Sequence, residues 1–158
     1  MELASSFEQS FQCKHTIETH APGRVNLLGE HVDYNDGVVL PAAIDRRVSL
    51  FASRTADDSV ILHALDLGKQ VTFRLRDLDQ KCDQNGNPLP GWARYPAGVA
   101  WALQQAGLNL SGMQAVYTSD IPIGAGLSSS AAVEVAFAAT WQELSGWKID
   151  KLSLAKLC

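Results

Sequence analysis

Several features that would place the chain in a special class of proteins are missing from its sequence. Its 158 residues include three cysteines, Cys13, Cys82 and Cys158, which are far apart and form no C-x-x-C pair. This pattern predicts reduced thiols rather than a disulfide framework. The four histidines are not spaced as zinc ligands are. The cysteine pattern therefore favours a cytoplasmic protein.

The chain also lacks the segments that target proteins to membranes or nucleic acids. No apolar run approaches the roughly 20 residues that a membrane-spanning helix needs. The N-terminal stretch MELASSFEQSF contains two glutamates and no basic region, so we expect no signal peptide. The net charge is −4 and no basic tract occurs. These properties predict no nucleic-acid partner and no membrane partner.

What remains is an ordinary globular composition, with 46% hydrophobic and 19% charged residues. Several strands come first, followed by a helix, a strand and a helix, so the order predicts an α+β fold. A final amphipathic segment, KIDKLSLAKLC, stops in the middle of its pattern, so we expect the chain to be part of something longer. The expected helices are 3–13, 96–105 and 128–146, and the expected strands are 15–20, 46–54, 59–65, 70–76 and 113–121.

One candidate site is the stretch PIGAGLSSSAA, residues 122–132. Gly124 and Gly126 leave the backbone bare, and the serines at 128–130 stand where the following helix begins. Unpaired N–H groups and the positive end of the helix dipole would attract an anion there, so we expect a phosphate-binding loop. The alternative is a plain serine N-cap after a flexible approach. No lysine follows as in a P-loop.

The second candidate site is APGRVNLLGEHVDYNDGVVLP, residues 21–41. Arg24 is the one fixed positive charge in its polar part, and its planar fork suits an oxyanion. Glu30, His31 and Asp33 follow closely, and grouped carboxylates and imidazole suit a neutral molecule with many hydroxyl groups, such as a sugar. The density of polar groups favours a binding site.

Each of these residues also has a structural explanation. Arg24 could pair with Glu30, and His31 could be a buried histidine that is simply satisfied. The sequence DYNDG could be only a turn, to which we assign Asp36.

Together, the two segments resemble the GHMP small-molecule kinases, and the first resembles the signature of the galactokinase family. The resemblance implies a ribosomal protein S5 domain 2-like fold, a mixed sheet with helices packed on one side. Residues 1–158 would be the N-terminal GHMP kinase domain, with a sugar-binding motif at 22–41 and a phosphate-binding loop at 122–132. The C-terminal domain would be absent from this chain.

The resemblance further implies an activity and a role for individual residues. Members of the galactokinase family use ATP and Mg2+ to phosphorylate α-D-galactose at its anomeric hydroxyl, which gives galactose 1-phosphate. Arg24 would be catalytic, and Ser130 would help to hold the metal. The residues implied to bind the sugar are Glu30, His31, Val32 and Asp33. Those implied to bind the ATP phosphates are Gly124, Ala125, Gly126, Leu127, Ser128, Ser129 and Ser130.

The family's remaining catalytic residues would lie after position 158, so we expect the chain alone to be inactive, and we expect a monomer. Two alternatives stay open. The protein could be a non-catalytic regulator that senses galactose, or another GHMP sugar kinase such as an N-acetylgalactosamine kinase.

Overall fold

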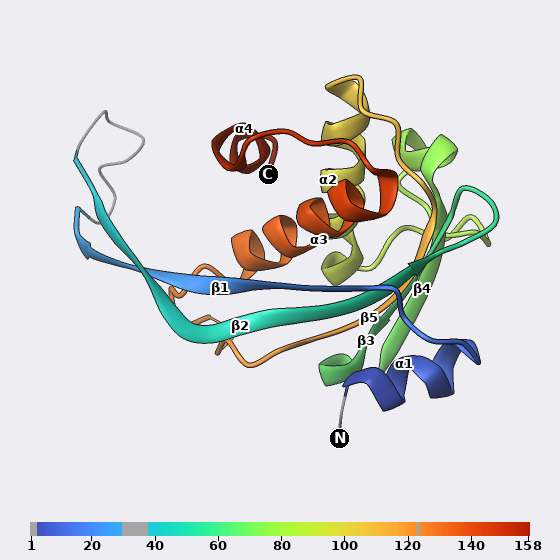
Figure 1. The fold of residues 1–158 in the computed structure, drawn as a ribbon, viewed down its shortest axis with the longest axis horizontal. Coiled ribbons are helices and arrows are strands. Elements are labelled where there is room, and N and C mark those ends of the chain that lie inside the picture. The colour runs from blue at the N-terminus through green and yellow to red at the C-terminus, as the bar shows by residue number, and fades with distance from the viewer. Residues whose placement is uncertain (1–2, 30–37, 123) are drawn as a thin grey trace.

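The computed structural model describes residues 3–29, 38–122 and 124–158. Five strands form one sheet in the order β1-β2-β5-β3-β4 (Figure 1). Neighbouring strands are antiparallel except β3 and β5, which are parallel, so the sheet is mixed as expected. The strands are β1 (Ile17–Leu28), β2 (Leu40–Arg54), β3 (Ser59–Ala64), β4 (Lys69–Arg74) and β5 (Met113–Ser119).

Three helices lie on one face of this sheet and one lies on the other (Figure 1). The face with three carries α2, α3 and α4, and α1 is on the opposite face. No helix among the described residues is long and apolar enough to cross a membrane. The helices are α1 (Leu3–Phe11), α2 (Gly91–Gln105), α3 (Ser129–Ser145) and α4 (Lys151–Lys156), with two 3-10 helices, η2 (Leu65–Leu67) and η3 (Leu75–Gln80).

The main core lies between the sheet and α3. Alternate residues of β2 and β3, among them Leu50 and Leu62, are fully buried on this face, as the period of two along a strand predicts. Phe137 and Trp141 of α3 are also fully buried. Because α3 packs against β1, β2, α2 and α4, it is apolar around most of its circumference. The sheet and this helix therefore fix the position of the loop that precedes α3.

The second face of the sheet also carries apolar and aromatic side chains, which α1 covers. The ring of Phe11 lies 4.9 Å from that of His63 on β3, and the His15 ring lies 4.4 Å from that of Phe51 on β2. Val116 on this face of β5 is fully buried. The expected packing of helices on one side therefore holds for α2, α3 and α4, whereas α1 extends the fold to two covered faces.

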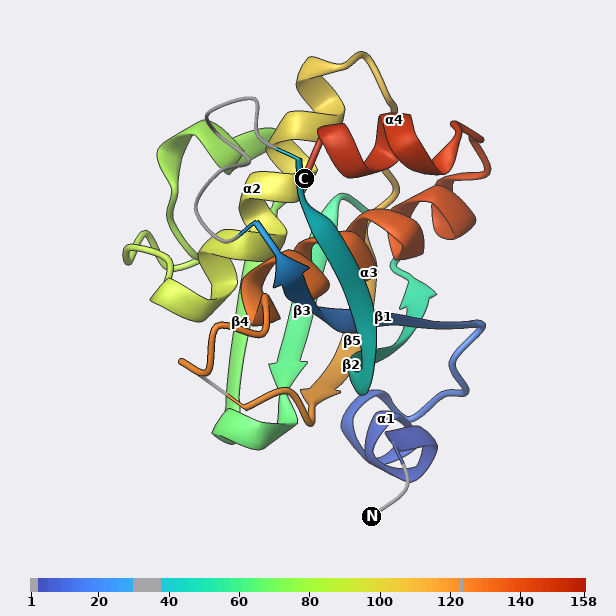
Figure 2. The same cartoon turned by 90° about the vertical axis from the view of Figure 1, so that its left-hand side faces the viewer.

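Three element boundaries differ from the sequence prediction by five residues or more. β2 begins at Leu40 instead of Arg46. β1 continues to Leu28 instead of ending near His20, and with β2 it forms a long ribbon whose far end projects beyond the rest of the sheet (Figures 1 and 2). Helix α2 begins at Gly91, directly after Pro90, so that Pro96 lies inside it. A proline there removes one backbone hydrogen bond but does not end the helix.

Candidate functional site

The two candidate segments, about 100 residues apart in sequence, touch each other in the structure. The backbone N–H of Arg24 on β1 donates a hydrogen bond to the carbonyl oxygen of Leu127 in the glycine–serine loop, with an N–O distance of 3.1 Å. The pairing of β1 with β2 shifts register between Pro22 and Arg24, and at this irregularity the Arg24 N–H bonds to the loop. The exposed Arg24 side chain thus starts from a backbone that is tied to the loop.

Gly23 makes this close approach possible. A Cβ atom at this position would lie 2.9 Å from the carbonyl oxygen of Leu127 and 3.0 Å from Cδ1 of Ile44. The first distance is shorter than real Cβ contacts, and the atom concerned belongs to the backbone, so it cannot move aside without moving the loop. Glycine is therefore required here for a steric reason. The sequence analysis did not single out Gly23, because its neighbour Leu127 is remote in the chain.

The glycine–serine loop has left-handed backbone at alternate positions. Gly124, Gly126 and Ser128 have φ angles of 75°, 71° and 57°. Such a conformation is unusual for serine, and among the described residues only Gln12 and Lys81 share it without being glycine. Alternation of this kind can turn backbone N–H groups toward one side, as in anion-binding loops.

Ser128 is the N-cap of α3, but its hydroxyl makes no capping hydrogen bond. Its carbonyl oxygen accepts the first helical hydrogen bond, from the N–H of Ala132 at 3.0 Å. The structure therefore does not support the alternative of an ordinary serine cap, in which the side chain satisfies a free N–H group. Ser129 and Ser130 form the first turn of α3, whose leading N–H groups lack intrahelical partners.

This arrangement offers two kinds of positive potential to a ligand. The N-terminal end of the 17-residue helix α3 carries partial positive charge, and the Arg24 guanidinium carries a full one. Gly124, Ala125, Gly126 and Ser130 are exposed, and Leu127, Ser128 and Ser129 are half-buried, so a ligand can reach the loop. An anion bound at the start of α3 would be stabilised by the positive end of the helix.

The residues expected to contact a sugar, Glu30, His31, Val32 and Asp33, lie outside the described residues. Their nearest described neighbours are the ends of the ribbon formed by β1 and β2. Leu28 and Val38, on either side of this segment, are 69% and 92% exposed. The segment is therefore attached to the strand that also carries Arg24.

Two further residues were missed by the sequence analysis. The indole N–H of Trp92, at the start of α2, is buried and has no hydrogen-bond partner in the described part of the chain. Its ring lies 6.2 Å from that of Tyr117 on β5, the strand that leads into the loop. A buried donor without a partner calls for an explanation such as a ligand or water. No local sequence pattern identifies such a donor.

The second missed residue is Glu134, which lies four residues after Ser130 on α3 and so on the same side of the helix. Burial raises the pKa of its carboxyl group. Within the described ranges, no three histidine, cysteine, aspartate or glutamate side chains gather as a metal site would require. Ser129, Ser130 and Glu134 carry the side-chain oxygens of the first two turns of α3. The spacing of four residues between Ser130 and Glu134 is the sequence signal that could have identified Glu134.

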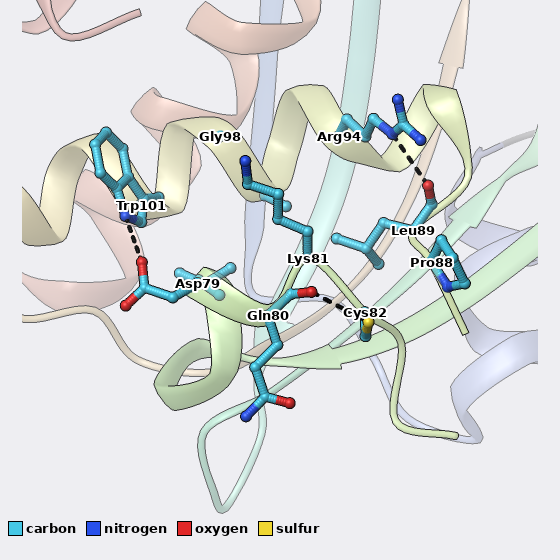
Figure 3. Close-up of a pocket in the computed structure, with 11 residues that line it drawn as sticks. Asp79, Gln80, Lys81, Cys82, Pro88, Leu89, Arg94, Gly98 and Trp101 are labelled. Carbon is cyan, nitrogen blue, oxygen red and sulfur yellow. Dashed lines mark hydrogen bonds between the residues drawn. The ribbon is translucent and has the colours of Figure 1, made fainter. Parts of the chain in front are cut away.

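A well-formed pocket lies elsewhere in the described structure. It has a volume of about 810 Å3 and lies between α2 and the segment that runs from η3 to Pro88 and Leu89 (Figure 3). Neither Arg24 nor any residue of the glycine–serine loop lines it.

Comparison with known families matches both candidate segments. Residues 5–54 match the galactokinase galactose-binding signature, and residues 94–158 match the GHMP kinases N-terminal domain. The first match includes Arg24 and the second includes the glycine–serine loop. Together the two matches cover most of the chain.

Related proteins agree with these matches. A galactokinase from a Roseiflexus species is 44% identical over 99% of this chain and 38% of its own length. A galactokinase from Streptomyces coelicolor is 43% identical over 87% of the chain and 34% of its own length. The chain thus spans little more than a third of the curated relatives it matches.

Solved structures give the same family. The crystal structure of Lactococcus lactis galactokinase complexed with galactose superimposes with a TM-score of 0.85 and 29% identity, over 98% of this chain and 39% of that one. The Methanococcus jannaschii mevalonate kinase shares the fold, with a TM-score of 0.74 at 24% identity. The chain therefore contains a match to the GHMP kinases N-terminal domain at residues 94–158 and to the galactose-binding signature of the galactokinases at residues 5–54.

Proposed function

We propose that the protein to which this chain belongs is a galactokinase, which transfers the γ-phosphoryl group of ATP to the anomeric hydroxyl of α-D-galactose. The observation that carries this proposal is the hydrogen bond from the Arg24 N–H to the Leu127 carbonyl. It joins a strand of the galactose-binding signature to the loop suited to phosphate. The galactokinases among the relatives support the choice of reaction, and the Lactococcus lactis complex supports the choice of sugar.

The residues of the loop fit the phosphates of ATP. Exposed backbone from Gly124 to Gly126 and the leading N–H groups of α3 would donate hydrogen bonds to phosphate oxygens. The remaining loop residues, Leu127, Ser128, Ser129 and Ser130, would complete the phosphate contacts.

Mg2+ would neutralise charge on the nucleotide phosphates during transfer. The Ser130 hydroxyl, in the exposed first turn of α3, would be one of its ligands. A hydroxyl oxygen suits a hard cation, which commonly keeps several waters and takes few protein ligands. The absence of a ready-made acidic cluster in the described ranges is compatible with such a site.

Arg24 would stabilise the charge of the phosphoryl group as it moves between nucleotide and sugar. Phosphoryl transfer depends mainly on positioning and on charge stabilisation. Removal of one well-placed donor at such a centre costs about 2.7–4 kcal/mol in comparable enzymes. The hydrogen bond of its own backbone to the loop would keep the Arg24 main chain beside the bound phosphates, within reach of its side chain.

The sugar would be held by the segment after β1. Glu30, His31 and Asp33 would exchange hydrogen bonds with its hydroxyl groups, and Val32 would contact it between them. We further propose that the protein acts as a monomer in the cytoplasm.

The test measures ADP release by the complete protein with ATP, Mg2+ and galactose. We expect Arg24→Ala to lower kcat by about a hundredfold or more. Arg76→Ala is the matched control. It removes an exposed arginine that pairs with Asp58 and lies outside the candidate site, so it should change kcat by less than about twofold. Equal turnover of the Arg24→Ala and wild-type proteins would refute the catalytic role. Galactose binding without turnover would favour a regulator instead.

A further inference from the structure

The pocket of about 810 Å3 beside α2 has the size and the lining of a ligand site (Figure 3). Its volume is in the range of pockets that hold small organic molecules. Leu78, Leu89 and Ala97 contribute an apolar wall and are at most 8% exposed, so they are held in place by the core. The pocket therefore has a rigid apolar side.

The charged residues of the pocket are mostly basic. Lys81 and Arg94 line it, and neither pairs with a carboxylate in the described part of the chain. Arg94 donates from Nε to the carbonyl oxygen of Leu89 at 3.2 Å, which fixes the start of its guanidinium and leaves the outer nitrogens available. The single lining carboxylate is Asp79. The lining is thus net positive, although the whole chain has a charge of −4.

The Lys81 side chain extends across the pocket. Its backbone has a φ of 54°, a left-handed conformation that a lysine seldom adopts. In Figure 3 the side chain runs from the end of η3 in the direction of α2. Lys81 is exposed and lines the pocket, so its ammonium group can reach an anion bound there.

On its α2 side the pocket is lined by the aromatic ring of Trp101 and by Gly98, which has no side chain to fill it. Trp101 is 45% exposed, and its indole N–H donates to Asp79 Oδ1 at 2.9 Å, which fixes the ring at one end of the pocket. Gly98 lies inside α2, where glycine destabilises a helix relative to alanine. A Cβ atom there would meet no atom within 4 Å, so packing does not explain the glycine. Its effect is to keep the pocket open.

We propose that this pocket binds a small organic anion with a flat apolar body, that is, an aromatic carboxylate or phosphate monoester. The body would lie against Leu78, Leu89 and Ala97, with its edge at Trp101. The anionic group would lie between Lys81 and Arg94. No lining residue belongs to the site of Arg24 and the glycine–serine loop, so this proposal stands apart from the proposed kinase function.

The test follows the Trp101 indole N–H by NMR in protein labelled with 15N-tryptophan, and Trp101→Phe assigns the signal. The probes are 1-naphthyl phosphate and 1-naphthoate, with 1-naphthol and inorganic phosphate as comparisons for the body alone and the charge alone. We expect both naphthyl anions to shift the signal saturably and to bind at least about tenfold more tightly than either comparison compound. No saturable shift with either anion would overturn the proposal, as would an equal effect of inorganic phosphate.

Gly98→Leu gives the decisive variant, because it fills the pocket while it improves helix propensity. We expect its Tm to equal or exceed that of the wild type and its affinity for the naphthyl anions to fall by at least about tenfold. Lys81→Asn, which removes the charge with a residue that tolerates the left-handed conformation, and Arg94→Gln should each weaken binding by about threefold or more. Lys148→Gln, outside the pocket, is the matched control. Unchanged affinity in a folded Gly98→Leu protein would overturn the proposal.

Discussion

The hydroxyl oxygens of Thr19 and Thr140 lie 2.6 Å apart and join β1 to α3. Thr140 is fully buried and its hydroxyl also donates to the Ala136 carbonyl at 2.8 Å, so the Thr19 hydroxyl is the donor between the two threonines. Farther along β1, the Arg24 N–H bonds to Leu127, just before α3 begins. The strand that carries Arg24 is thus attached to the helix and to its leading loop at two places.

We expect Thr140→Val to destabilise the protein by about 1–3 kcal/mol, because it removes a buried hydroxyl and leaves the Thr19 hydroxyl with only the Ala136 carbonyl oxygen, 3.5 Å away, as an acceptor. Thr19→Val should cost less, because Thr140 keeps its bond to Ala136. Urea denaturation measures both free energies of unfolding. The double variant should cost little more than Thr140→Val alone. Strict additivity of the two single effects would contradict a coupled pair.

Gly23→Ala should separate the loop from β1. The new methyl group would collide with the Leu127 carbonyl oxygen, so the hydrogen bond from Arg24 should weaken. We expect faster hydrogen exchange of the Arg24 amide and at least about tenfold weaker ATP binding by calorimetry. Gly91→Ala, at a glycine with open space around it, is the control and should change neither. An Arg24 amide that stays protected in Gly23→Ala would show that the steric argument is wrong.

Ser130→Ala should reduce the contribution of Mg2+ to nucleotide binding while it leaves the fold intact, because Ser130 is exposed at the start of α3. Calorimetry with and without Mg2+ measures this contribution. We expect the gain in ATP affinity on adding Mg2+ to fall by about tenfold in the variant. Ser5→Ala, on the exposed side of α1, should keep the full gain. A normal gain in Ser130→Ala would remove Ser130 from the metal site.

The docking of α1 on the sheet should make stability depend on pH through His63. Burial lowers the pKa of His63 below its ordinary value of 6.5, and its Nδ1 lies 3.0 Å from the Ser10 hydroxyl of α1. The unfolded chain therefore binds the proton more readily than the native protein. The contribution of neutral His63 to the free energy of unfolding is thus complete above pH 6.5 and is lost as the pH falls below that value.

The measurement is Tm between about pH 7.5 and about pH 5, the range in which histidines titrate. The wild-type Tm should fall on acidification. His63→Phe, which keeps an aromatic ring against Phe11, should show a smaller fall. His20→Gln, at an exposed histidine of β1, should behave like the wild type. Identical pH profiles for His63→Phe and wild type would contradict the prediction.

Most elements of the fold could be predicted from periodicity, and the differences have physical reasons. The strand expected at 15–20 is the edge strand β1, but it continues to Leu28. Pro22 does not end it, because a proline can be accommodated at the edge of a sheet without breaking a shared ladder. The second covered face was missed because the aromatic residues of that face, Phe51 and His63, come from different strands.

The candidate site was predicted in part. Bare glycines before a serine-rich helix start are a local pattern, so the loop at 122–132 could be found from the sequence. Its contact with Arg24 depends on strand pairing across about 100 residues, and no pattern in either segment encodes it. Trp92 and Gly23 were missed for the same reason, because their roles depend on a neighbour from another part of the chain.

The place of β5 in the sheet has a consequence for how the chain folds during synthesis. β1 with β2, and β3 with β4, are antiparallel pairs of strands that follow each other in sequence. They are joined only by β5, which pairs with β2 on one side and β3 on the other. As the ribosome makes the chain from its N-terminus, the two early pairs must wait unconnected until residues 113–119 emerge, and their exposed edges are then the region that a chaperone would protect.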